Sequence, residues 1–172
     1  MDEAEFVAQR QRMVAEIAVH TVLLTGRLDK AALSRRVMEA MAKVPRHAFV
    51  RAELQEMAYA DTPLPTDCGK TISQPFIVAL MTDLLDLQPG DRVLEVGTGF
   101  GYQSAVLAEL AAHVCTVELI PELAREARRR LLRVGCGRVD IRVGDGRAGW
   151  PERAPFDKII VTAAPDWVPV PL

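Results

Sequence analysis

Apolar residues recur at helical spacing in the first quarter of the chain, among charged and polar neighbours. Gly26 ends the first run, and Pro45 ends a second run that Asp29 is positioned to cap. The apolar positions of the first run are Phe6, Met13, Ile17 and Leu24. Those of the second run are Leu33, Val37, Met41 and Val44. The pattern predicts two amphipathic helices.

Periodicity is lost between residues 46 and 75, where prolines and a glycine accumulate. The pattern predicts a long loop, and long loops in compact domains are often functional.

Strand-like and helix-like segments alternate from residue 76 onward. The expected helices are 76–87, 101–111 and 121–134. The expected strands are 92–96, 113–119, 139–143 and 158–162. This alternation predicts an α/β fold with a doubly wound, mostly parallel sheet. We assign residues 1–75 to N-terminal helices and a loop and residues 76–172 to the α/β core, within one compact domain.

Composition narrows the class of partner. The 172 residues are 49% hydrophobic with a net charge of −2, which is typical of a soluble globular protein and favours neither a nucleic-acid nor a membrane partner. No apolar run is long enough to span a bilayer, and the acidic N-terminus is unlike a secretory signal. The three cysteines suit neither a disulfide framework nor a metal-ligand spacing, so we expect a cytoplasmic protein with no metal site.

A glycine-rich turn follows the expected strand 92–96. Gly97, Gly99 and Gly101 stand where a strand passes into a helix, the context in which a nucleotide-type ligand binds a helix N-terminus. A dinucleotide fingerprint requires its third glycine at the position of Tyr102, which weakens that interpretation. Glu95 would repel a pyrophosphate but attract an ammonium group. The turn therefore favours S-adenosylmethionine.

Acidic residues also end the next two expected strands. Glu118 is positioned to accept the ribose hydroxyls, and Asp145 with Gly146 is positioned to meet the adenine. The alternative for each acidic residue alone is a solvated strand end or a helix cap.

Six segments resemble the protein-L-isoaspartate (D-aspartate) O-methyltransferase family. They are Val44–Val50, Ala58–Pro65, Thr71–Pro75, Val93–Gly99, Gly144–Gly146 and Ile159–Ala164. The resemblance implies a Rossmann-like fold and methyl transfer from S-adenosylmethionine, leaving S-adenosylhomocysteine. It also implies that the acceptor is the free α-carboxylate of L-isoaspartyl residues in damaged proteins or peptides, as a step of protein repair.

The resemblance assigns roles to individual residues. It implies that Thr71, Ile72, Ser73 and Gln74 bind the substrate and that the Ser73 hydroxyl holds the substrate carboxylate. The implied cofactor residues are Glu95, Gly97, Thr98, Gly99, Glu118, Asp145 and Gly146. The acceptor carboxylate is ionised at neutral pH, so it needs placement rather than a strong general base. Ser73 is equally suited to cap the helix that begins at Pro75 or Phe76.

The chain departs from the family pattern at Lys70, at Phe100 and at its C-terminal end. Lys70 places a cation beside the expected substrate segment, and Phe100 places a bulky ring in the glycine turn, where it is expected to crowd the cofactor. The family's C-terminal strands are missing, so strand Lys158–Thr162 is expected at an open edge that pairs with a second copy or a partner chain. Two alternatives therefore stay open. One is a related carboxyl methyltransferase acting on aspartate of a modified peptide, and the other is a truncated cofactor-binding or interaction protein without turnover.

Overall fold

The computed structural model describes residues 2–28, 31–163 and 172. The chain divides into two compact units, residues 1–84 and residues 85–172, and each is described by itself. None of the helices among the described residues is long and apolar enough to cross a membrane.

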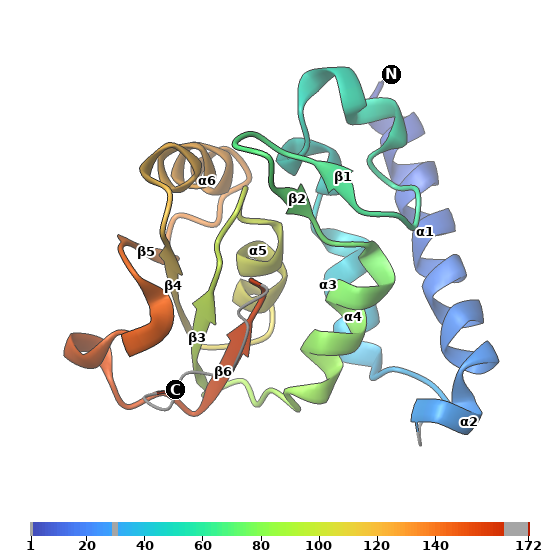
Figure 1. Ribbon diagram of the computed structural model, residues 1–172. Helices are drawn as coiled ribbons and strands as arrows, with labels where there is room; N and C mark the ends of the chain where they lie inside the picture. The colour runs from blue at the N-terminus through green and yellow to red at the C-terminus, as the bar shows by residue number, and fades with distance from the viewer. Residues whose placement is uncertain (1, 29–30, 164–171) are drawn as a thin grey trace. The chain divides into compact units, whose positions relative to one another are not determined.

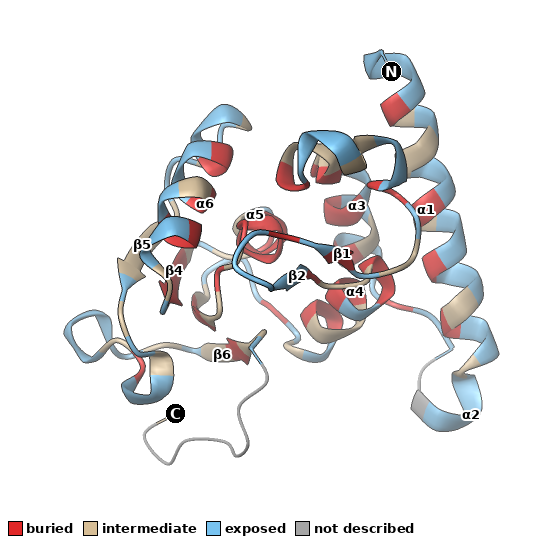
Figure 2. Ribbon diagram, turned by 45° about the horizontal axis from the view of Figure 1, so that its top comes forward, coloured by how far each residue is buried: buried red, intermediate tan, exposed pale blue. Residues whose placement is uncertain are grey.

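Helices form most of the first unit. Helix α1 spans Glu3–Leu23, and the short helix α2 spans Thr25–Leu28. Helix α3 spans Arg35–Lys43, and the Ser34 hydroxyl accepts a hydrogen bond from the backbone of its first turn. The cap of α3 is therefore Ser34 and not the predicted Asp29, which lies outside the described residues. Both predicted amphipathic helices are confirmed, and Figure 2 shows the buried positions of α1 spaced along the helix between exposed ones.

The fourth helix, α4, spans Pro75–Leu84 and contacts α1 and α3. Its contacts therefore group it with the N-terminal helices, whereas the predicted division after residue 75 placed it with the α/β core. The functional roles assigned to the two segments stay predictions.

The segment predicted as a loop contains regular structure, so that prediction is wrong in detail. Two 3₁₀ helices, η1 and η2, span Arg46–Phe49 and Ala52–Met57. A short antiparallel hairpin follows, in which β1 (Leu64–Pro65) pairs with β2 (Thr71–Ile72). The elements are too short to show periodicity, which explains why the hydrophobic pattern does not predict them.

A parallel four-stranded sheet forms the second unit. Its strand order is β5-β4-β3-β6, and every neighbouring pair is parallel (Figure 1). The strands are β3 (Arg92–Val96), β4 (His113–Glu118), β5 (Asp140–Val143) and β6 (Lys158–Val161). The predicted α/β fold is confirmed, and β6 lies at one edge of this sheet, as expected.

Two helices pack on the sheet and shape its C-terminal edge. Helix α5 spans Tyr102–Ala108, and α6 spans Pro121–Arg133. Six consecutive residues of α5 are buried, which makes it the most enclosed helix in Figure 2. The 3₁₀ turns η3 (Gly146–Ala148) and η4 (Pro151–Arg153) follow β5. Helix α5 begins directly after the glycine turn. Because α5 is buried in the core, its first residues hold the C-terminal end of the turn in place.

Candidate cofactor and substrate sites

The glycine turn lies at the C-terminal end of β3 and requires glycine for two reasons. Gly97, Gly99 and Gly101 all have positive φ angles, of 105°, 55° and 92°. A Cβ atom at Gly97 would also lie 2.9 Å from the backbone nitrogen of Ala163. The turn therefore brings bare backbone to the edge of the sheet, where a ligand can approach closely.

Hydroxyl groups connect the turn to the neighbouring strands. The Thr98 hydroxyl pairs with the Thr116 hydroxyl over 2.6 Å, and both side chains are buried. The Thr162 hydroxyl donates to the carbonyl oxygen of Gly97 over 2.7 Å. The side chain of Thr98 thus supports the turn from the protein interior. Thr162 is a supporting residue that the sequence pattern did not indicate.

Glu118 holds the turn through its carboxylate. Its Oε2 atom accepts a hydrogen bond from the Gly99 backbone over 2.8 Å, and its Oε1 atom accepts one from Ile120 over 2.9 Å. The side chain is buried. A carboxylate has about four acceptor positions, so two remain for the hydroxyls of a ribose. The arrangement fits the predicted role of Glu118 and adds a second one, the fixing of Gly99.

Glu95 is fully buried on β3. Burial raises the pKa of its carboxyl group to about 7, against the opposing effect of the hydrogen bond from the Ser104 hydroxyl of α5. Its Oε1 atom is buried without a hydrogen-bond partner among the described residues. When it is ionised, this buried carboxyl group creates a negative potential that favours a cationic ligand group and disfavours a pyrophosphate.

Asp145 and Gly146 follow β5 at the same edge. Asp145 is exposed, and its carboxylate accepts hydrogen bonds from the guanidinium of Arg147 and then from its backbone N–H, which lowers the pKa of Asp145. A Cβ atom at Gly146 would lie 2.4 Å from Cγ1 of Val96. Glycine is therefore required there for the η3 turn to pack on the end of β3.

Backbone hydrogen bonds bring these predicted residues together. Gly97 donates to Val117 over 2.9 Å, and Gly144 donates to Glu118 over 2.9 Å. The C-terminal ends of β3, β4 and β5 are thereby joined into one continuous edge. This edge combines the backbone of the glycine turn with the carboxyl groups of Glu95, Glu118 and Asp145. Such a set of donors and acceptors fits S-adenosylmethionine.

Phe100 was expected to project into the glycine turn, but its side chain points into the interior of the unit. Its side chain is 2% exposed, and the guanidinium carbon of Arg130 on α6 lies 4.3 Å from the ring centroid. The ring occupies the interior of the unit and forms a cation–π contact there. The buried position of the ring argues against the expected crowding of the cofactor by Phe100.

The segment expected to bind substrate lies in the first unit, and Arg46 anchors it. Arg46 is fully buried, and its guanidinium donates to the carbonyl oxygens of Ala58 and Ser73, each over 2.8 Å. The Ser73 side chain is half-buried. Arg46 thus fixes the backbone that carries the Ser73 hydroxyl.

Asp61 anchors the same segment from the other side. Its Oδ1 atom accepts a hydrogen bond from the Phe76 backbone over 2.8 Å, and its Oδ2 atom accepts one from Nε2 of Gln74 over 3.0 Å. Nδ1 of His20 lies 2.7 Å from Oδ2. Asp61 therefore accepts the hydrogen bond of a backbone N–H in the first turn of α4. The sequence analysis considered Ser73 for this capping role.

The remaining residues of the segment have different environments. Ile72 is buried, so its side chain belongs to the core of the unit. Thr71 and Lys70 are exposed at the end of the hairpin. The anchors Arg46, Asp61 and His20 were missed by the sequence analysis, although Arg46 and Asp61 lie within segments that resemble the family.

Comparisons with known proteins agree with this geometry. The model of the protein-L-isoaspartate(D-aspartate) O-methyltransferase family matches residues 19–172. Protein-L-isoaspartate O-methyltransferase 1 of Polaromonas sp. is 62% identical over 172 residues, which cover 100% of this chain and 73% of the relative. Protein-L-isoaspartate O-methyltransferase of Picosynechococcus sp. is 52% identical over 166 residues, which cover 96% of this chain and 71% of the relative.

Solved structures agree as well. A protein-L-isoaspartate O-methyltransferase with 29% identity superposes with a TM-score of 0.79 over 94% of this chain, which spans 50% of that solved chain. A putative protein-L-isoaspartate O-methyltransferase from Plasmodium falciparum, solved in complex with S-adenosyl-L-homocysteine, has a TM-score of 0.70. Its identity is 24%, and the match covers 88% of this chain and 74% of that one, so it supports the fold.

The match of the family model and the identity to relatives along the whole chain establish the family. The chain belongs to the protein-L-isoaspartate(D-aspartate) O-methyltransferase family, whose members are S-adenosylmethionine-dependent methyltransferases.

Proposed function

We propose that the chain transfers a methyl group from S-adenosylmethionine to the free α-carboxylate of L-isoaspartyl residues in damaged proteins and peptides. The carrying observation is the double anchoring of the Ser73–Gln74 segment by Arg46 and Asp61. Methyltransferases in general share the glycine turn, whereas the anchored segment that carries the Ser73 hydroxyl supports a dedicated carboxylate acceptor site. The geometry of the glycine turn supports the choice of methyl donor.

When bound, S-adenosylmethionine supplies an electrophilic methyl group. The acceptor carboxylate is ionised at neutral pH, so the protein needs no strong base. The Ser73 hydroxyl donates a hydrogen bond to this carboxylate and fixes its orientation, and Gln74 orients the adjacent peptide. Placement of the two reactants supplies the catalysis, because alignment removes the entropic part of the barrier.

The second unit holds the methyl donor in this proposal. The backbone of Gly97, Thr98 and Gly99 would hold the methionine part of the donor. Glu118 would accept hydrogen bonds from the ribose hydroxyls, and Asp145 with Gly146 would bind the adenine. Glu95, which is fully buried, would attract the positive charge of the donor when its carboxyl group is ionised.

One argument for the alternative of a binding protein without turnover is weakened by the position of Phe100. The Phe100 ring was expected to crowd the donor, but it packs in the core against Arg130. The other alternative, a methyltransferase that acts on aspartate of a modified peptide, is distinguished from the proposed activity by experiment. Labelled methyl transfer is measured with an isoaspartyl peptide and with its aspartyl twin, and stronger transfer to the isoaspartyl peptide supports the proposal.

Two further predictions concern partners and location. Among the described residues, β6 lies at one edge of the sheet, and an unpaired edge is able to recruit another strand. Pairing with a second chain at this edge stays a prediction, which sedimentation of the chain tests directly. The three cysteines are free thiols, which suits the predicted cytoplasmic location.

A further inference from the structure

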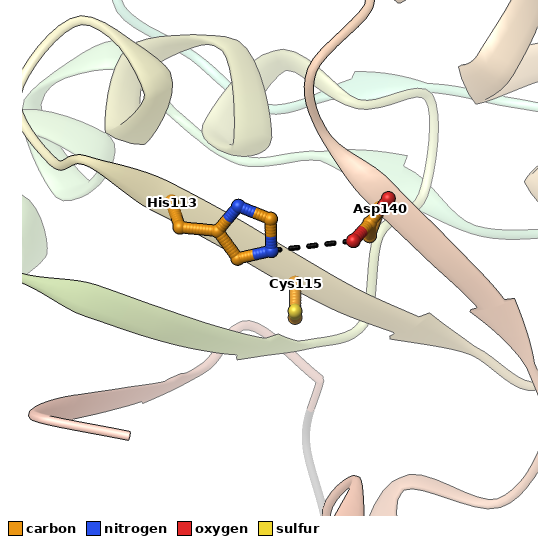
Figure 3. Close-up of side chains that lie close together, drawn as sticks. All are labelled: His113, Cys115 and Asp140. Atoms are coloured by element: carbon orange, nitrogen blue, oxygen red, sulfur yellow. Dashed lines mark ion pairs between the residues drawn. The ribbon is translucent and has the colours of Figure 1, made fainter. Parts of the chain in front are cut away.

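A compact group of possible metal ligands lies on the sheet of the second unit, away from the proposed donor site. It consists of His113 and Cys115 on β4 and Asp140 on β5 (Figure 3). The three potential ligand atoms lie within 4.8 Å of one another. In Figure 3 the imidazole points toward the Asp140 carboxylate, and Nε2 lies 3.2 Å from Oδ2.

Strand geometry explains why these side chains converge. His113 and Cys115 are two positions apart on one strand, so they project from the same face of the sheet. Cys115 is the register partner of Asp140 on the neighbouring strand, which places the carboxylate on that face too. The group is part of the rigid sheet and does not depend on a loop.

The group lies at the opposite end of β4 from Glu118. His113 begins the strand and Glu118 ends it, a separation of roughly 16 Å at the usual rise per residue. The proposed donor site uses the C-terminal ends of the strands, whereas this group uses their N-terminal ends. A ligand bound here therefore does not compete with the methyl donor.

We propose that His113, Cys115 and Asp140 form a zinc site that ties β4 to β5. Cysteine thiolate, histidine imidazole and aspartate carboxylate are each ligands of Zn²⁺, and in sites with three protein ligands a water molecule completes the tetrahedron. The thiolate and the imidazole select Zn²⁺ against Mg²⁺ and Ca²⁺, which prefer oxygen ligands. The three ligands alone compensate the charge of the ion, because two of them are anionic.

The geometry is close to what zinc requires. Tetrahedral zinc ligands lie about 3.3–3.8 Å from one another, so the group must contract by roughly 1 Å. Cys115 is fully buried and held in the core cluster with Leu94 and Val117. The side chains of His113 and Asp140 are 33% and 36% exposed, so these two have room to rotate toward the sulfur.

A neighbouring arginine and the protonation of the thiol both affect how the group would bind the ion. Nη2 of Arg153 lies 3.2 Å from Oδ2 of Asp140, a contact that orients the carboxylate as an outer partner of a metal ligand. Burial raises the pKa of the Cys115 thiol, so zinc displaces a proton from sulfur, and this proton passes to solvent. No redox step is involved.

Cobalt titration of the chelator-treated chain tests the proposal, because Co²⁺ replaces Zn²⁺ and reports thiolate ligation by a charge-transfer absorption. We expect this absorption in the unmodified chain, its displacement by Zn²⁺, and its persistence in excess Mg²⁺. Cys115→Ser is expected to lose it, while Cys68→Ser, which alters an exposed thiol outside the group, is expected to keep it.

His113→Gln and Asp140→Asn are expected to weaken Co²⁺ binding at least about tenfold. These variants carry the test if Cys115→Ser fails to fold, because both side chains are partly exposed. Zinc is also expected to raise the melting temperature of the unmodified chain and not that of His113→Gln. Cobalt binding that lacks the thiolate absorption, or that is equally strong in His113→Gln and the unmodified chain, would overturn the proposal.

Discussion

The Arg46 guanidinium donates to the carbonyl oxygen of Ser73 over 2.8 Å from a fully buried position. The same guanidinium donates to Ala58 through Nε. One side chain therefore fixes both ends of the segment that joins η2 to α4. Because the Ser73 hydroxyl is proposed to hold the acceptor carboxylate, the placement of that hydroxyl depends on a fully buried residue.

Arg46→Lys tests this dependence. Lysine keeps the charge but has one nitrogen, which cannot reproduce the planar fork that reaches two carbonyl oxygens. We expect kcat/KM for an isoaspartyl peptide to fall at least about tenfold, since small misplacement of a positioning group is costly. Methyl-donor affinity, measured by calorimetry, is expected to stay within about twofold. An equal loss of donor affinity in this variant would contradict a positioning role.

Glu118→Gln tests the support of the glycine turn. The amide keeps one acceptor oxygen but turns a donor toward either Gly99 or Ile120, whose backbone N–H groups both need an acceptor. We expect the affinity for S-adenosylmethionine and for S-adenosylhomocysteine to fall about tenfold or more. Glu122→Gln, an exposed change at the start of α6, is the matched control and is expected to bind both normally. Normal binding by Glu118→Gln would remove Glu118 from the donor site.

Glu95→Gln tests the electrostatic role of the buried carboxyl. The pKa of this group rises from its ordinary value of 4.5 to about 7 on folding. The folded chain therefore holds this proton more tightly, so Glu95 destabilises the fold progressively as the pH rises through that window. We expect Glu95→Gln to raise the free energy of unfolding by up to about 3 kcal/mol at pH 8 and little at pH 4. Urea unfolding at both pH values measures this, with the exposed change Glu53→Gln as control.

The same variant affects ligand binding. An ionised Glu95 attracts the positive charge of S-adenosylmethionine, so affinity is expected to rise as the pH increases through about 7. In Glu95→Gln this pH dependence is expected to disappear. S-adenosylhomocysteine, which lacks the sulfonium charge, is expected to show a weaker dependence. An unchanged pH profile in the variant would show that another group controls affinity.

Gly146→Ala tests the packing of the η3 turn. The new methyl group would lie 2.4 Å from Cγ1 of Val96, so the turn or the strand must move. We expect a loss of about 1–3 kcal/mol in the free energy of unfolding, as for other overpacked sites. Gly90→Ala is the control, since no heavy atom lies within 4 Å of the added carbon. Equal melting temperatures for the two variants would contradict the close contact.

The sequence predicted the elements of the second unit well, because long apolar runs and turn residues define them. The predicted strand 92–96 has the same bounds as β3, and Pro121 begins α6 as expected. The hairpin at residues 64–72 and the cap of α4 by Asp61 were not predicted. Both depend on contacts between residues far apart in the chain, which periodicity does not report.

The candidate site shows the same distinction. The glycine turn and Glu118 were predictable, because strand ends meet at one edge of a parallel sheet. The burial of Glu95 and the inward packing of Phe100 were not, since the pattern around a turn does not indicate which side chains face the core. The convergence of His113, Cys115 and Asp140 was also hidden, because it depends on the register between two strands.

Transfer of labelled methyl from S-adenosylmethionine to an isoaspartyl peptide, beside its aspartyl twin and a blank without peptide, is the most direct test. The account predicts transfer to the isoaspartyl peptide well above the other two, with Ser73→Ala lowering it while donor affinity changes little. Thr25→Ala, which removes a hydroxyl in α2, is expected to behave like the unmodified chain. Equal transfer to both peptides, or full activity in Ser73→Ala, would contradict the proposed acceptor site.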